Sequence, residues 1–193
     1  MELKRVVVTG LGAVTPVGNN PEETWANLLA GKSGAAPITL FNTEMFKTKF
    51  ACEVKDLNVT DYIDRKEMRK MDRYCQLAMI SAMQGIKDAN IDVETEDLDR
   101  VGVIFGVGIG GIKTFQDEVT YYGQHEDQGP KFNPFFIPKM IADIAAGQIS
   151  IQYGFHGPNY TTTSACASSS NALADAFNLI RLGKANIIVS GGA

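Results

Sequence analysis

One cysteine lies where a protein can use a nucleophile. Cys166 stands in the run SACASSS (164–170), between a β-rich stretch and a helix expected from about residue 167 to 182. At the start of a helix, unpaired N–H groups and the positive end of the helix dipole favour a thiolate and can bind an oxyanion. Free cysteines are usually buried and inert, so the position leaves two interpretations open, a reactive thiol or a core residue.

The other two cysteines and both histidines lack such a setting. Cys75 falls on the apolar stripe of an expected helix, and we interpret both Cys52 and Cys75 as core residues. His125 lies in a polar loop and His156 in a turn, so neither can be assigned as a base for Cys166. The three cysteines form no Cys-x-x-Cys pair, and the sequence predicts neither a disulfide framework nor a bound metal.

Five basic residues lie close together near the start of a helix expected over residues 64–87. They are Arg65, Lys66, Arg69, Lys70 and Arg73. At about 100° per residue they would share an arc of roughly 140°, opposite an apolar stripe. Cations near a helix start oppose the macrodipole, so local stability does not explain them. The arc is either a solvated face or a docking surface for an acidic partner.

Two glycine-rich turns follow apolar runs. Residues 10–15 (GLGAVT) imitate a dinucleotide-binding loop, but Thr15 replaces its third glycine and Pro16 follows where a helix should begin. Residues 106–111 (GVGIGG) lack the lysine of a phosphate loop. The apolar Val107 and Ile109 in this second segment indicate either a plain turn or the border of an apolar cavity.

Strands and helices are expected to alternate along the chain. The expected strands are 6–8, one near 50–54, 101–105, 160–163 and 187–189, and the expected helices are 21–30, 64–87, 112–121, 138–149 and 167–182. This order predicts an α/β fold whose strands are covered by helices on both faces. Because the chain stops directly after a strand that reads as buried, we expect it to be the front part of a longer protein.

Composition and charge exclude several classes of protein. The 193 residues are 45% hydrophobic and carry 18 Lys+Arg against 22 Asp+Glu, a formal net charge of −4. Such a chain can bury a core, and its charge disfavours unselective nucleic-acid binding. Since the sequence contains no long apolar run and no signal peptide, we expect no membrane span and a cytoplasmic location.

Five motifs occur in an order that points to a known family. They are VVVTGLGAVTPVG (6–18), RKEMRKMD (65–72), GIGG (108–111), PFFIP (134–138) and TSACASS (163–169). Together they resemble the β-ketoacyl-[acyl carrier protein] synthases, above all the elongating synthases II of bacterial fatty-acid synthesis. The resemblance implies a thiolase-like α/β fold with a buried mixed sheet. Residues 1–193 would be its N-terminal half, truncated before the C-terminal half.

The resemblance also implies a chemistry and a partner. Cys166 matches the nucleophile that takes an acyl group from acyl carrier protein before a decarboxylating Claisen condensation with malonyl-carrier protein, and its own N–H would help to form the oxyanion hole. Ile109 matches the residue that gates the acyl pocket. Phe136 matches the aromatic residue that reaches this pocket from the partner subunit of a homodimer. The carrier-docking positions of the family are matched by Lys66, Arg69 and Lys70.

No cofactor is implied by the resemblance. The family pairs its cysteine with two histidines, a lysine and a phenylalanine from the back half, so we expect residues 1–193 alone to be inactive. Two other interpretations stay open: a non-catalytic chain-length-factor-like partner and a thiolase-like acyl-CoA enzyme. Cys166 disfavours the first, because chain-length factors lack the cysteine, and the basic arc disfavours the second.

Overall fold

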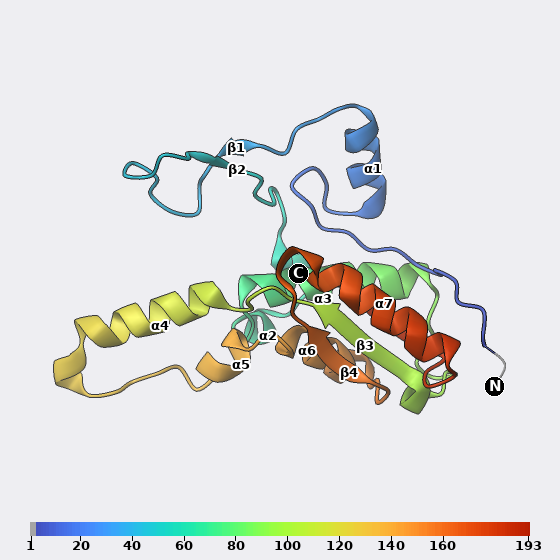
Figure 1. The fold of residues 1–193 in the computed structure, drawn as a ribbon. Coiled ribbons are helices and arrows are strands. Elements are labelled where there is room, and N and C mark those ends of the chain that lie inside the picture. Colours follow the sequence, from blue (N-terminus) through green and yellow to red (C-terminus); the bar gives the residue numbers. More distant parts are fainter. Residues whose placement is uncertain (1–2) are drawn as a thin grey trace.

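The computed structural model describes residues 3–193, and a parallel sheet of three strands lies at its centre. The strand order is β4–β3–β5, and Val103 of β3 pairs with Asn159 of β4 on one side and Val189 of β5 on the other. The strands therefore share one carboxyl edge (Figure 1). The helices and strands are α1 (Pro21–Leu29), β1 (Ala36–Pro37), β2 (Phe50–Ala51), α2 (Arg65–Met68), α3 (Arg73–Asp88), β3 (Val101–Gly106), α4 (Ile112–Gln124), α5 (Phe136–Met140), α6 (Ile144–Tyr153), β4 (Asn159–Thr162), α7 (Ser168–Arg181) and β5 (Ile187–Gly192).

Helices cover both faces of this sheet, as the alternation of strands and helices predicted. On one face Ile104 of β3 packs against Ala172 and Ala176 of α7, whose small side chains let the helix lie close to the strand. On the other face Val103 and Phe105 pack into a core shared with α3 and α6. Alternate side chains of one strand thus fill two separate helix–sheet interfaces.

The α/β class is confirmed. Within residues 3–193, both strand pairs of the central sheet, β3 with β4 and β3 with β5, are parallel. A mixed sheet was expected. In the described part of the chain, β1 and β2 are antiparallel. They form a two-stranded ribbon that is separate from the central sheet (Figure 1). No helix in this part of the chain is long and apolar enough to cross a membrane.

The strand expected at residues 6–8 is wrong. Residues 3–14 form no regular secondary structure, and Val8 is 81% exposed. The segment is held beside α3 by side chains instead: the Leu11 N–H donates to Asp88 Oδ2 (2.9 Å) and the Ala13 N–H to Gln84 Oε1 (3.0 Å). An apolar cavity of about 610 Å³ separates it from β5. A β-branched run becomes a strand only where a neighbouring strand takes its backbone groups.

The single helix expected over residues 64–87 is two helices, α2 and α3. The chain turns between them, and Asp72 begins α3 by accepting a hydrogen bond from the Tyr74 N–H (3.4 Å). The other oxygen of Asp72 accepts from Thr114, 42 residues later in the chain. The helix is thus interrupted before Asp72, and the five basic residues do not share one helical arc. The helix expected at 138–149 is likewise divided, into α5 and α6.

Helix α4 projects from the body as an arm, and the chain returns along residues 125–135 to α5 (Figure 1). Aromatic rings join the two sides of the arm, since Phe132 of the returning segment lies against Tyr122 of α4 with ring centroids 5.4 Å apart. Apolar side chains of α4 stay partly exposed. Its exposed apolar residues recur at helical spacing and are Ile112, Phe115 and Val119.

Candidate active site

Cys166 is exposed in a single 3₁₀ turn, Ala165–Ala167, directly ahead of α7. Ala165 has φ +51°, in the left-handed region that non-glycine residues rarely adopt. The buried hydroxyl of Ser168 holds the turn, accepting from the Ser164 N–H (2.9 Å) and donating to the Ala165 carbonyl (2.7 Å). Cys166 is therefore presented at a sharp bend that the surrounding structure stabilises against backbone strain.

Two glycines at strand ends bring the first turn of α7 against the sheet. A Cβ at Gly106 of β3 would lie 2.2 Å from the carbonyl carbon of Ser168, and one at Gly192 of β5 would lie 2.4 Å from the Cβ of Ser169. Any side chain at either position would push α7 away from the strands. The turn with Cys166 thus lies at the carboxyl edge of the parallel sheet, where α/β folds commonly form binding sites.

The loop Gly108–Gly111 starts next to the Cys166 turn. Thr163 donates its hydroxyl hydrogen to the Val107 carbonyl (3.0 Å), so the end of β3 is joined to the segment that leads into the turn. Ile109 follows Val107 by two residues and is 72% exposed. The structure thus brings the loops of Ile109 and Cys166 to one edge of the sheet. The gating role of Ile109 stays a prediction.

Phe136 lies on the arm rather than at the Cys166 turn. It is the first residue of α5, and its ring stacks on Phe132 and, at 6.3 Å between centroids, on Phe115 of α4. The prediction that Phe136 reaches the acyl pocket of a second subunit stays untested, because the structure contains a single chain.

The basic residues form a surface over α2 and the turn that follows it. Lys66 and Arg69 are exposed, and within residues 3–193 neither forms an ion pair. Lys70 is partly buried, with its Nζ 2.6 Å from Glu67 Oε1 and 5.9 Å from the ring centroid of Phe135. The predicted docking residues therefore lie close together along α2 and the turn that follows it, and they do not belong to one continuous helix.

The remaining cysteines differ from each other. Cys75 is fully buried on α3, as predicted, and desolvation together with the nearby Asp72 carboxylate raises the pKa of its thiol to about 12. Cys52 is exposed, so its interpretation as a core residue is wrong. It directly follows β2, in a short ribbon whose side chains are mostly exposed.

Neither histidine lies near Cys166. His156 is at the opposite edge of the sheet, because the N–H of the next residue, Gly157, donates to the carbonyl of Val101 at the amino end of β3. The six residues of β3 separate the two edges by about 17 Å. His125 caps the carboxyl end of α4, on the arm. In the described part of the chain, no group of three or more His, Cys, Asp or Glu side chains is arranged to hold a metal ion.

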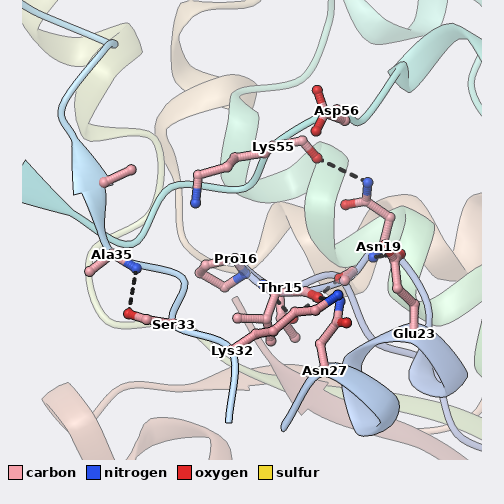
Figure 2. A pocket seen from close by; sticks show the side chains of 13 residues that line it. Thr15, Pro16, Asn19, Glu23, Asn27, Lys32, Ser33, Ala35, Lys55 and Asp56 are labelled. Atoms are coloured by element: carbon pink, nitrogen blue, oxygen red, sulfur yellow. Dashed lines mark hydrogen bonds between the residues drawn. The ribbon is translucent and has the colours of Figure 1, made fainter. Parts of the chain in front are cut away.

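A second cavity, of about 350 Å³, lies between α1 and the segments that follow β2 and precede β1 (Figure 2). Much of its polar lining is already hydrogen-bonded. Lys55 donates to the Gly34 carbonyl (2.6 Å), and the Asn19 side-chain amide donates to the Lys55 carbonyl (2.9 Å). None of the predicted site residues lines this cavity, so it is not the candidate active site.

The sequence interpretation missed two buried polar residues, Ser168 and Asp72. Asp72 directly precedes the apolar periodicity of α3, which is a recognised sign of a helix start and would have indicated the break after α2. Its partner Thr114 could not be inferred, because nothing local links residues 42 positions apart. Ser168 is one of three consecutive serines, and the sequence does not indicate which of them faces inward.

The fold and the site together define a class: an α/β protein that presents a cysteine on a braced turn at the carboxyl edge of a parallel sheet. Residues 3–193 match the family model described as "Beta-ketoacyl synthase, N-terminal domain", and the chain belongs to this family.

Curated relatives of this chain carry the name 3-oxoacyl-[acyl-carrier-protein] synthase 2. The one from Staphylococcus aureus (strain COL) is 43% identical over 190 residues, covering 98% of this chain and 45% of the relative. The one from Synechocystis sp. (strain ATCC 27184 / PCC 6803 / Kazusa) is 44% identical over 193 residues, covering 100% of this chain and 46% of the relative. This chain therefore spans a little under half the length of these relatives.

A solved structure shares the fold. The ishigamide ketosynthase/chain length factor aligns with a TM-score of 0.85 at 30% sequence identity, over 99% of this chain and 47% of that chain. The thiolase-like architecture expected from the sequence is thereby confirmed.

Proposed function

We propose that the full-length protein is a β-ketoacyl-carrier synthase of fatty-acid elongation, of which residues 1–193 are the N-terminal half. The observation that carries the proposal is the exposed Cys166 on its braced turn at the carboxyl edge of the sheet. The names of the curated relatives add the reaction, the formation of a 3-oxoacyl group on a carrier protein.

The chemistry begins with acyl transfer to the cysteine. The Cys166 thiolate attacks the thioester carbonyl of acyl-carrier protein, the carrier thiol leaves, and an acyl thioester remains on Sγ. Malonyl-carrier protein then loses CO₂, and the electron pair of the broken C–C bond forms an enolate. The enolate carbon attacks the Cys166 thioester, a C–C bond forms, the C–S bond breaks, and the thiolate is restored. No cofactor takes part.

The Cys166 turn suits the oxyanions that form in both thioester attacks. The N–H of Cys166 itself, directly ahead of α7, is a fixed donor that needs no rearrangement as charge develops. The N–H groups of Ala167 and Ser168 instead hold the turn, donating to the carbonyls of Ser164 and Ala165. Stabilising the enolate requires further donors, and we assign these to the part of the protein beyond residue 193. The two histidines described here are too far from Cys166 to supply them.

A homodimer is part of the proposal. Ile109 would gate the acyl pocket of its own subunit, and Phe136 would reach the pocket of the other subunit. The exposed apolar surface of α4 supports this arrangement, because Ile112 and Val119 are exposed beside the aromatic stack that contains Phe115 and Phe136. Exposed apolar surface of this kind favours association with another protein surface.

Acyl carrier protein is the proposed partner of the basic surface formed by Lys66, Arg69 and Lys70. Lys66 and Arg69 support this role because both are exposed without an ion pair in residues 3–193. Replacing all three by glutamate should slow association with the carrier and flatten its dependence on salt concentration. Unchanged binding at every ionic strength would mean that the residues are only a solvated face.

The proposed reaction is tested with the full-length protein and two substrates. Acyl-carrier protein should add the mass of its acyl group to the peptide that contains Cys166, and malonyl-carrier protein should then release CO₂. Cys166→Ser should abolish the acyl-thioester adduct and the condensation. An acyl group found on Cys52 would contradict the proposal. Faster transfer from acyl-coenzyme A than from acyl-carrier protein would instead favour a thiolase-like acyl-CoA enzyme.

A further inference from the structure

We propose that Asp72 is a positioning residue that couples the basic turn after α2 to the Ile109 loop, so that docking of the carrier protein sets the position of the loop. The inference rests on the proposed function and goes beyond it. It assigns to a buried carboxylate the transmission between two sites, the docking surface and the border of the acyl pocket.

The Asp72 carboxylate is buried, only 8% exposed, and is satisfied by hydrogen bonds rather than by a cation. Its Oδ2 accepts from both the N–H (3.0 Å) and the hydroxyl (2.6 Å) of Thr114, and Oδ1 accepts from the Tyr74 N–H. Within residues 3–193 it forms no ion pair. A buried charge is costly unless its hydrogen bonds are well made, so this link resists being stretched or broken.

The link joins the basic surface to the start of α4. Asp72 follows Lys70 by two residues, so the docking turn and the carboxylate share one short backbone segment. Thr114 lies in the first turn of α4, which begins immediately after Gly111 at the end of the Ile109 loop. A displacement of the docking turn is thereby passed to the base of the arm, where the loop ends.

The loop is attached to residue Met140 at its α4 end and has open space around its Gly108 end. The Gly111 N–H donates to the Met140 carbonyl (2.9 Å), and a Cβ at Gly110, whose φ is +96°, would lie 2.5 Å from the same oxygen. A Cβ at Gly108 would meet no atom within 4 Å. Movement at the α4 end therefore changes the position of Ile109, because the Gly108 end has room to follow.

A second hydrogen bond connects residues 72–74 to the segment at Met140 and Ile141, which contacts the Ile109 loop. The Tyr74 hydroxyl donates to the Ile141 carbonyl (2.5 Å), next to the Met140 carbonyl that holds Gly111. Burial, with the neighbouring Cys75 and Asp72, raises the pKa of the Tyr74 phenol well above its usual range, so the hydroxyl keeps its proton and stays a donor. Residues 72–74 thus contact both segments that flank the Ile109 loop.

The test compares one acyl group on two thioesters in the full-length protein, acyl-carrier protein and the small N-acetylcysteamine thioester. Asp72→Asn replaces one acceptor oxygen by an NH₂ donor and removes the charge. At saturating carrier we expect the rate constant for acylation of Cys166 to fall about tenfold, within the range typical of coupling between sites. The rate with the small thioester should stay within about twofold of wild type, because no carrier docks in that reaction.

Thr114→Val is the second variant, since it removes only the hydroxyl and nearly keeps the side-chain shape. It should produce a smaller effect of the same kind, and in the double variant the two effects should not add. Asp92→Asn is the control. Asp92 also accepts a hydrogen bond from the N–H two residues later (3.0 Å), but it lies in the exposed loop after α3 and should change neither rate.

Several outcomes would overturn the coupling while leaving the proposed function standing. Equal slowing with both thioesters would mean that Asp72 only supports the structure, and a weaker carrier affinity with an unchanged rate constant would make it a docking residue. No change in either variant would mean that the hydrogen bonds transmit nothing. If the wild-type protein acylates Cys166 from neither thioester, the proposed function fails first and the coupling fails with it.

Discussion

Similar apolar runs are buried in the central body of this protein and exposed in its front segment. In the body, Val103 of β3 and Ile149 of α6 are completely buried. In the front segment, residues 3–58, Val8 and Leu29 belong to equally apolar runs yet are 81% and 70% exposed. The body has helix layers on both faces of its paired strands, whereas the front segment has one short helix and a ribbon of two strands, each two residues long. Apolar patterning therefore determines structure only where the chain supplies the opposing surface.

The largest expected effect is the difference in decarboxylation activity between residues 1–193 alone and the full-length protein. Residues 1–193 expressed alone should release no detectable CO₂ from malonyl-carrier protein, whereas the full-length protein should. Losing one oxyanion donor typically lowers the rate about 10²–10³-fold, and we expect the donors for the enolate to lie beyond this chain. Comparable rates in a side-by-side assay would show that residues 1–193 contain the complete site.

The second prediction compares burial in the two regions by truncating one side chain in each. Ile149→Ala should lower the free energy of unfolding of the full-length protein by about 2–5 kcal/mol, because it removes packed core volume. Leu29→Ala on α1 should change it by less than about 0.5 kcal/mol. Denaturant unfolding measures both. An equally large cost for Leu29→Ala would mean that another part of the protein covers the front segment.

The third prediction concerns two neighbouring glycines at the carboxyl edge of β3. Gly106→Ala would place a methyl group against the backbone of Ser168 and should cost about 1–3 kcal/mol of stability, with slower acylation of Cys166 because α7 is displaced. Gly108→Ala is the matched control, since its methyl group would meet no atom within 4 Å. Thermal unfolding that is equally lowered in both variants would rule out close approach as the cause.

Local sequence predicted the body well and its long-range contacts poorly. The strands around Val103 and Val189, α7 and its end at Gly183, and the position of Cys166 ahead of a helix all followed from patterns a few residues long. The contact between Asp72 and Thr114 did not, because it joins residues 42 positions apart, and the exposure of Val8 did not, because it depends on the absence of a paired strand in the described residues. The left-handed φ of Ala165, whose carbonyl accepts a hydrogen bond from Ser168, could not be predicted from the local sequence either.

The features of the candidate site also divide into those that local sequence predicts and those that depend on tertiary contacts. The identity of the candidate nucleophile could be predicted, since a cysteine at a strand–helix junction is locally visible. Its bracing by Ser168, the close approach of Gly106 to α7 and the link from Asp72 to the Ile109 loop all join residues that tertiary structure brings together. The exposure of Cys52 is a related case, because the sequence does not say whether a short ribbon will be covered.

The central claim, that Cys166 is the reactive thiol, is tested most directly by the alkylation rates of the three cysteines in the folded full-length protein. Brief iodoacetamide treatment near pH 8, followed by mass spectrometry of the peptides, should label Cys166 fastest and Cys52 more slowly. Cys75 should stay unlabelled, because its pKa of about 12 keeps the thiol protonated until the pH approaches that value. Labelling of Cys52 or Cys75 as fast as Cys166 would contradict the assignment.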